Sequence, residues 1–358
     1  MNNRPGRLLV LVVLNITLTL VALPGHASSY DPSVCADYAY GDPDIPSDCV
    51  TMMESFPEPT VIDVPRDGRT LGNYTYWRLG PHVVNLYDAP NGNVVEVMPE
   101  GFNFAIAIDT SVAGWVQIQG GQWVHEADTK VTPPSEFRGV NLLSPLEHPF
   151  AWVMDNMYSS DYPGGPQSPE NGRLMLRYDR VNLFGEAVDE DGWTWYLIGP
   201  DQWIDQRLLA IANKVERPEG VSGRWVAIDL YEQTLVAYEE DMPVFATLVS
   251  SGLPQWDTNE GIFEVWARLE TDGMSGATGA PDAYALQSVP WTMYFDNDIS
   301  LHGTYWHDGF GYRHSHGCVN LSISDAHYLF NWTMDVEPDE DGDILTYVYV
   351  YSSGEYGS

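Results

Sequence analysis

Positive charge is scarce in this sequence. The 358 residues contain 16 lysines and arginines against 51 aspartates and glutamates, which gives a formal net charge of −35. A surface of this sign repels nucleic acid phosphates and anionic lipid headgroups, so we expect neither to be a partner. The charge is typical of a highly soluble protein and identifies no specific cationic partner.

Cysteine is scarce as well, with three residues in the whole chain. Cys35 and Cys49 lie close together in a Pro- and Asp-rich stretch that has little apolar content of its own. In an oxidising compartment such a pair would form a disulfide that fixes the loop between them. Cys318 would then remain as an unpaired thiol, which requires an explanation in a secreted protein.

Long apolar runs are absent after residue 23. The one early run, residues 8–23, follows Arg4 and Arg7 and precedes a small-residue site at Ala27. This pattern predicts a signal peptide over residues 1–27, with an uncleaved anchor as the alternative. No later segment is apolar enough to cross a bilayer. We therefore expect a secreted protein of the cell envelope, with no stable membrane span after cleavage.

Long helical periodicity is missing until Ser324, which we expect to cap a short helix with an apolar stripe. Aromatic residues make up 13% of the chain, and they favour pleated, half-buried surfaces. The fold class predicted is therefore mainly β. In the C-terminal third, strands are expected at 225–230, 233–238, 243–250 and 344–350.

Two further segments lack regular periodicity. The Pro- and Asp-rich residues 28–66 are predicted to form an extended linker, fixed locally by the disulfide. Residues 268–281 contain three glycines and are expected to be a mobile loop over a site or an ordinary connection.

An internal repeat is present in the middle of the chain. A Gly-Trp pair, an apolar run, a tight turn and a Gln-Trp pair occur at 114–124 and again at 192–204. The phrase resembles the last hairpin of bacterial Src-homology-3-like domains, which are small β-barrels. It predicts two such domains, at 67–135 and 140–214, whose tryptophans serve as core residues or as wall-binding groups.

The residues that carry chemistry gather near the C-terminus, where His302 precedes Cys318 by a short interval. A cysteine nucleophile needs an imidazole to take its proton and backbone N–H groups for the developing oxyanion. Two alternatives compete with this interpretation. Imidazoles and a thiolate can bind zinc, although no second cysteine is nearby, and a lone cysteine can be an inert core residue.

These residues resemble the catalytic motif of the L,D-transpeptidase family, the YkuD-like domains. His-Gly-Thr at 302–304 is followed, after a short spacer, by Ser-His-Gly-Cys-Val-Asn at 315–320. Residues 258–265 are similar to a second family segment, with Asn259 where many members have proline. Asn320 stands where many members have arginine. The resemblance covers residues 222–352 and implies a sandwich-like core of mixed β-sheets with short helices.

The resemblance also implies the reaction. The thiol of Cys318 would attack a peptidoglycan tetrapeptide stem with His302 as general base, and terminal D-Ala would leave a thioester. An amine of a second stem would then form a cross-link. No cofactor and no metal are implied. The remaining roles are motif and oxyanion residues (Gly303, Ser315, His316, Gly317) and substrate-binding candidates (Tyr284, Asn320).

Two alternatives to cross-linking remain open. Water in place of the amine would make the protein an L,D-carboxypeptidase or endopeptidase that uses the same site. An inactive catalytic domain would leave a wall-binding protein. Wall glycan or peptide binding by the N-terminal β domains is a separate hypothesis.

Overall fold

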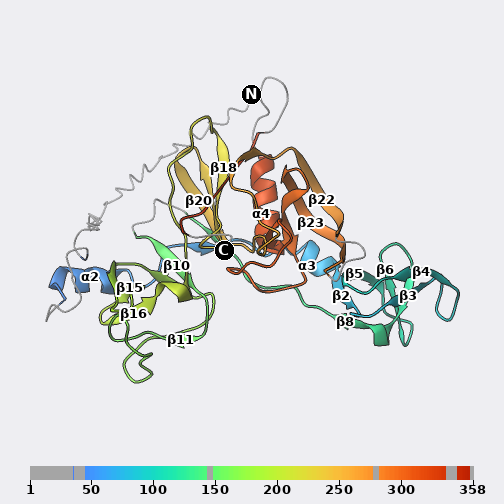
Figure 1. The fold of residues 1–358 in the computed structure, drawn as a ribbon, viewed down its shortest axis with the longest axis horizontal. Helices are drawn as coiled ribbons and strands as arrows, with labels where there is room; N and C mark the ends of the chain where they lie inside the picture. The colour runs from blue at the N-terminus through green and yellow to red at the C-terminus, as the bar shows by residue number, and fades with distance from the viewer. Residues whose placement is uncertain (1–34, 36–44, 143–147, 277–281, 336–344, 355–358) are drawn as a thin grey trace, which may run out of the picture. The chain divides into compact units, whose positions relative to one another are not determined.

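The computed structural model describes residues 35, 45–142, 148–276, 282–335 and 345–354, so the expected signal peptide lies outside the described residues. The fold is mainly β with mixed sheets (Figure 1). In the described part no helix has the length and apolarity needed to cross a membrane. The helical segments are α2 (Ser47–Ser55), α3 (Thr70–Asn73), α4 (Ile323–Met334) and the 3-10 turns η1 (Glu126–Asp128) and η2 (Gln206–Leu208).

One sheet contains the strands expected in the C-terminal third. Its order is β1-β9-β20-β19-β18-β26-β21, and β18 pairs in parallel with β26. The strands are β1 (Ile62–Asp63), β9 (Val140–Asn141), β18 (Arg224–Asp229), β19 (Thr234–Glu239), β20 (Met242–Leu248), β21 (Gly261–Glu264) and β26 (Tyr347–Tyr351).

A second sheet joins the C-terminal region to strands β2–β8 (residues 75–131), which we call the first β region. Its main path is β25-β24-β23-β5-β6-β7-β3-β4, with β22 on β23, β2 on β5 and β8 on β2. The junction is a parallel pairing of β23 with β5, in which Tyr284 lies opposite Phe102. The strands are β2 (Thr75–Leu79), β3 (Val84–Tyr87), β4 (Val94–Met98), β5 (Phe102–Asp109), β6 (Trp115–Ile118), β7 (Trp123–His125), β8 (Thr129–Val131), β22 (Ala267–Gly276), β23 (Tyr284–Asp296), β24 (Ile299–Thr304) and β25 (Val319–Ser322).

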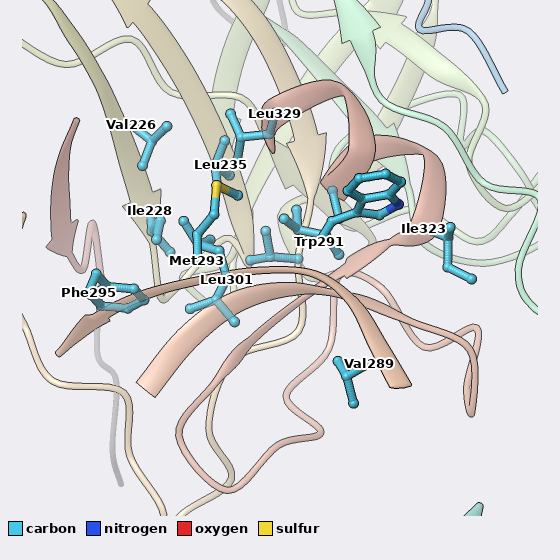
Figure 2. Close-up of a cluster of buried hydrophobic side chains, with 14 of the residues drawn as sticks. Val226, Ile228, Leu235, Val289, Trp291, Met293, Phe295, Leu301, Ile323 and Leu329 are labelled. Atoms are coloured by element: carbon cyan, nitrogen blue, oxygen red, sulfur yellow. The ribbon is translucent and has the colours of Figure 1, made fainter. Parts of the chain in front are cut away.

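The largest core lies between these two sheets. Val226 and Ile228 of β18 meet Met293 of β23 and Leu301 of β24, and Leu329 of α4 packs against them (Figure 2). Removal of such apolar area from water is the main favourable term in folding. The core therefore fixes β24, which carries His302, against the rest of the domain.

Helix α4 begins two residues earlier than predicted, because Ser322 caps it in place of Ser324. The Ser322 hydroxyl accepts the backbone N–H of Asp325 at 3.1 Å. Ser324 lies buried inside the first turn, where its hydroxyl accepts the N–H of Asp67 at 3.1 Å. The predicted cap was wrong. A cap residue needs a non-helical backbone, and Ser322, the last residue of strand β25, has one.

Residues 148–214 form smaller sheets with their own apolar clusters. Both copies of the repeated phrase form a hairpin, a 3-10 turn and a strand: β6, β7, η1 and β8 in the first, and β15, β16, η2 and β17 in the second. Membership of the Src-homology-3-like class stays a prediction. The strands are β10 (Phe150–Val153), β11 (Met157–Tyr158), β12 (Leu174–Met175), β13 (Arg180–Asn182), β14 (Gly185–Val188), β15 (Thr194–Gly199), β16 (Gln202–Asp205) and β17 (Leu209–Ile211).

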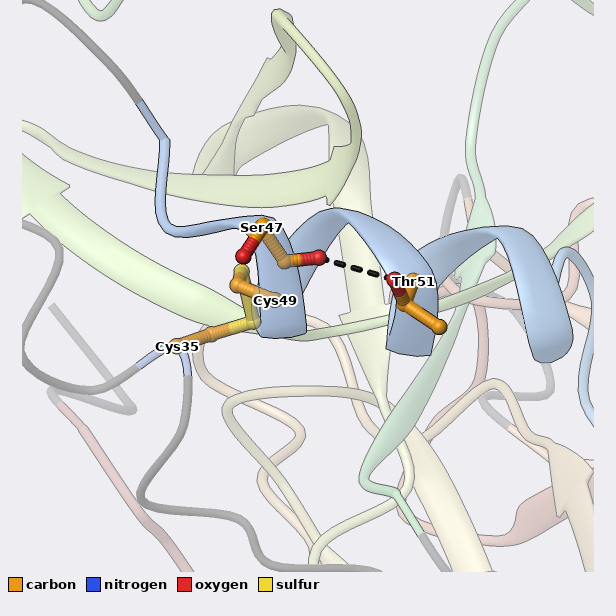
Figure 3. Close-up of a disulfide and its surroundings, with 4 residues drawn as sticks. All are labelled: Cys35, Ser47, Cys49 and Thr51. Carbon is orange, nitrogen blue, oxygen red and sulfur yellow. Dashed lines mark hydrogen bonds between the residues drawn. A yellow bond between two sulfur atoms is a disulfide. The ribbon is translucent and has the colours of Figure 1, made fainter.

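The expected linker contains a helix and a disulfide. Cys35 and Cys49 are disulfide-bonded at the first turn of α2, where Thr51 donates its hydroxyl to the Ser47 carbonyl at 2.8 Å (Figure 3). Cys49 and Met53 lie one turn apart and pack in one cluster with Leu197 of β15. The prediction of an extended chain was therefore wrong for residues 47–55. These residues form a helix whose two apolar side chains pack against strand β15.

The glycine-rich segment 268–281 also differs from expectation over its described part. Residues 268–276 belong to β22, which pairs antiparallel with β23. Residues 277–281 lie outside the described residues. The predicted loop over the site is thus a strand up to Gly276, and Met274 within it packs against the largest core.

Candidate active site

A cleft of about 310 Å³ lies where β23, β24 and the start of β25 meet β5. It contains both members of the predicted catalytic pair, His302 and Cys318, together with the predicted substrate residues Tyr284 and Asn320. The full lining is Phe102, Leu253, Met274, Asp282, Tyr284, Leu286, His302, Trp306, His314, Ser315, His316, Cys318 and Asn320.

Strand pairing places the catalytic pair. Strand β24 pairs in parallel with β25, with Leu301 opposite Val319 and His302 opposite Asn320. Cys318 precedes β25 and lies beside Ser300, whose hydroxyl oxygen is 3.7 Å from the thiol sulfur. Because side chains alternate along a strand, Ser300 and His302 share one face of β24. The thiol and the imidazole therefore reach the cleft from adjacent strands.

His302 is a buried imidazole. One ring nitrogen, Nδ1, lies 3.3 Å from the carbonyl oxygen of Gly303, which can orient the ring. If Nδ1 donates its proton to that carbonyl, Nε2 is left as the acceptor. The side chain is 2% exposed, and burial lowers its pKa to about 4, so the ring is neutral at pH 7.

The Cys318 thiol is also uncharged at rest. Its side chain is partly exposed to the cleft, yet the surrounding protein removes most of its water and raises the thiol pKa. The carboxylate of Asp298 adds a smaller effect of the same sign. The thiol and the imidazole that line this cleft are thus both uncharged near neutral pH.

The Ser-His-Gly-Cys turn is held by its own hydrogen bonds. Gly317 has a φ of 113°, a conformation that favours glycine, and its N–H donates to the Ser315 hydroxyl at 3.1 Å. Thr258, the first residue of the second family-like segment, donates to the Gly317 carbonyl at 2.7 Å. His316 lies between the rings of Trp256, 4.5 Å away by centroids, and Tyr284, 5.2 Å away.

Asn320 is oriented by His307, which the sequence did not single out. The N–H of Gly309 donates to Nδ1 of His307 at 3.0 Å, so the ring proton is on Nε2. This Nε2 lies 2.9 Å from the Asn320 amide nitrogen, while the amide oxygen is buried and has no partner among the described residues. Amide orientation follows from the hydrogen-bond network. A donating Nε2–H needs an acceptor, so the side-chain oxygen of Asn320 must face His307. The amide N–H₂ of Asn320 then points away from the His307 ring.

Several cleft residues escaped prediction from the sequence. Ser300 is buried behind the lining, beside the Cys318 sulfur, and lies two positions before His302, so strand alternation alone would have found it. His314, which was not among the predicted site residues, lines the cleft. Phe102 could not have been found, because it reaches the cleft only through the pairing of β5 with β23. Trp291 is not part of the cleft lining; it is buried and donates its indole N–H to Asp67 at 2.9 Å.

Comparisons with known proteins found one family match and several similar solved structures. Residues 223–343 match the model of the YkuD family, the L,D-transpeptidase catalytic domain. These residues are therefore an L,D-transpeptidase catalytic domain. The match lies within the predicted range of 222–352. No curated protein matches the chain.

Similar solved structures include an L,D-transpeptidase of Stackebrandtia nassauensis, at 26% identity and a TM-score of 0.30. The match covers 39% of this chain and 60% of that one. The catalytic domain of an L,D-transpeptidase of Enterococcus faecium is 25% identical with a TM-score of 0.30, over 37% of this chain and 99% of that domain. This chain thus spans less than two thirds of the first relative's length.

Proposed function

We propose that this protein is an extracytoplasmic L,D-transpeptidase that cross-links peptidoglycan stems through a thioester on Cys318. The observation that carries the proposal is the placement of Cys318 and His302 in one cleft on adjacent strands of an L,D-transpeptidase domain. The disulfide between Cys35 and Cys49 supports a site of action outside the reducing cytoplasm.

In the first half-reaction, the Cys318 sulfur attacks the carbonyl carbon of the third stem residue. The thiol proton passes to Nε2 of His302 and then to the nitrogen of the leaving D-Ala, so the carbon–nitrogen bond breaks and a thioester forms. An amine of a second stem then attacks the thioester. It loses a proton to His302, forms the new amide and releases the Cys318 thiol.

The negative charge that develops on the carbonyl oxygen needs N–H donors. The Gly317 N–H is already bonded to Ser315. The Cys318 N–H, for which the described residues provide no partner, is our candidate for the oxyanion donor. Tyr284 and the amide of Asn320 are candidates for substrate contacts on the walls of the cleft.

The acceptor decides between cross-linking and hydrolysis. Incubation of the purified protein with a disaccharide-tetrapeptide, with and without an acceptor amine, distinguishes the two. Cross-linked dimer is the expected product, and tripeptide formed at the same rate in both samples would indicate an L,D-carboxypeptidase. Wall binding by the two N-terminal β regions is a further proposal, tested by sedimentation of residues 28–214 with purified peptidoglycan.

A further inference from the structure

A single face of the second sheet runs out of the cleft onto the first β region. Residues paired directly across neighbouring strands place their side chains on the same face. Met274 lies opposite Leu286, and Leu286 lies opposite Phe104. Tyr284 lies opposite Phe102 in the same way. The cleft wall therefore continues from β22 through β23 to β5.

Two cations extend this face beyond β5. Arg78 of β2 lies opposite Phe104, and Lys130 of β8 lies opposite Arg78. Both side chains are exposed. The guanidinium carbon of Arg78 is 5.8 Å from the ring centroid of Phe102, a residue that lines the cleft. The cleft wall thus ends in two adjacent positive charges.

Neither Arg78 nor Lys130 forms an ion pair within the described residues, whereas arginines such as Arg66 and Arg138 are paired with carboxylates. Like charges directly opposite on neighbouring strands repel each other. In a chain with 51 acidic residues, an unpaired cation pair beside the cleft indicates an anionic ligand.

The lining of the cleft carries no permanent positive charge. Its lining contains Asp282 and neither lysine nor arginine, and the adjoining residues 277–281 are uncharged in sequence. The net charge of −35 would repel a stem peptide that carries carboxylates. Strands lie about 4.8 Å apart, so β2 is roughly 10 Å and β8 roughly 14 Å from β23, the strand that carries Tyr284 on the cleft wall.

We propose that Arg78 and Lys130 bind a carboxylate of the peptide stem while Cys318 reacts with it. The inference rests on the proposed function and adds to it a substrate preference, for stems with a free internal carboxylate over the amidated form. The first β region is then part of the substrate site, with Phe102 as the apolar wall and the two cations as the anchor.

The test uses the full-length mature protein and two tetrapeptide stems that differ only in whether the internal carboxylates are free or amidated. Acylation of Cys318 is followed by D-Ala release for wild type, Arg78→Gln, Lys130→Gln, Arg78→Lys and Lys214→Gln. Lys214 is the matched control, an exposed lysine outside the cleft lining. Binding to Cys318→Ala is measured by calorimetry with the same peptides.

We expect Arg78→Gln and Lys130→Gln each to raise KM about tenfold for the free-carboxylate stem, the range of one charge-assisted hydrogen bond. The amidated stem should show no change, Arg78→Lys should retain part of the preference, and Lys214→Gln should behave as wild type. Equal losses on both stems, or losses no larger than that of Lys214→Gln, would overturn the inference. If no stem acylates wild type, the proposed function fails, and binding to Cys318→Ala still tests the anion subsite.

Discussion

His307 and Asn320 form one unit, because Nε2 of the imidazole lies 2.9 Å from the side-chain amide of Asn320. The N–H of Gly309 occupies Nδ1, and burial keeps the pKa of His307 well below its usual range, so the ring stays neutral. The proton on Nε2 then determines which end of the Asn320 amide faces the ring. His307 is therefore a positioning residue for a side chain in the cleft.

His307→Ala should lower kcat/KM for acylation of Cys318 about tenfold, the usual effect of losing one hydrogen bond of this type. The reaction of Cys318 with a small alkylating reagent should be unchanged, because neither the thiol nor His302 is altered. His82→Ala, at an exposed histidine of the first β region, is the control. Equal loss of alkylation and acylation would mean that the substitution damages the site as a whole.

The pH dependence of acylation follows from the two resting protonation states. His302 must be unprotonated to accept the thiol proton, and its pKa is lowered to about 4 by burial. The acid limb of kcat/KM should therefore fall near pH 4, with a plateau through neutrality, because the Cys318 pKa is raised. An acid limb near pH 6.5 would contradict this account of His302.

Protein stability should depend on pH through the same histidine. Between pH 6.5 and pH 4 the unfolded chain binds a proton at this position and the folded chain does not, so stability falls as the pH is lowered through this window. The full loss is about 3 kcal/mol at pH 4 and below. His302→Gln should lose less stability over this window than wild type in urea unfolding, and parallel curves would refute the assignment.

The disulfide should stabilise the N-terminal part without affecting chemistry. Cys35 and Cys49 are separated by 14 positions. A bridge over a loop of this length contributes about 3 kcal/mol in the chain-entropy model. Cys35→Ser with Cys49→Ser should lower the urea midpoint while acylation of Cys318 at 25 °C stays at the wild-type rate. A lower acylation rate at a temperature where the variant is folded would contradict this prediction, because it would mean that the disulfide affects the geometry of the cleft.

Local patterns predicted much of the catalytic domain. Alternating apolar runs identified β18, β19, β20 and β26, and the spacing of His302 and Cys318 identified a shared site. These features are local, and the periodicity of a strand or the residue types of a motif encode them directly.

Features that depend on distant pairing were not predictable. The contribution of Phe102 to the cleft arises from a strand pairing over nearly two hundred positions of sequence, and no local pattern encodes it. Helix α2 was missed for a related reason. Its two apolar residues, Cys49 and Met53, are too few to indicate a helix from sequence. They are buried only because strand β15 packs against them.

Intact-mass spectrometry tests the central claim most directly. Mature wild-type protein and Cys318→Ala are mixed with a disaccharide-tetrapeptide and weighed within the first turnovers. The account predicts an adduct equal to the stem minus D-Ala on wild type, none on Cys318→Ala, and loss of the adduct when an acceptor amine is added. Folded wild-type protein that forms no adduct and releases no D-Ala from any of several stems would contradict it.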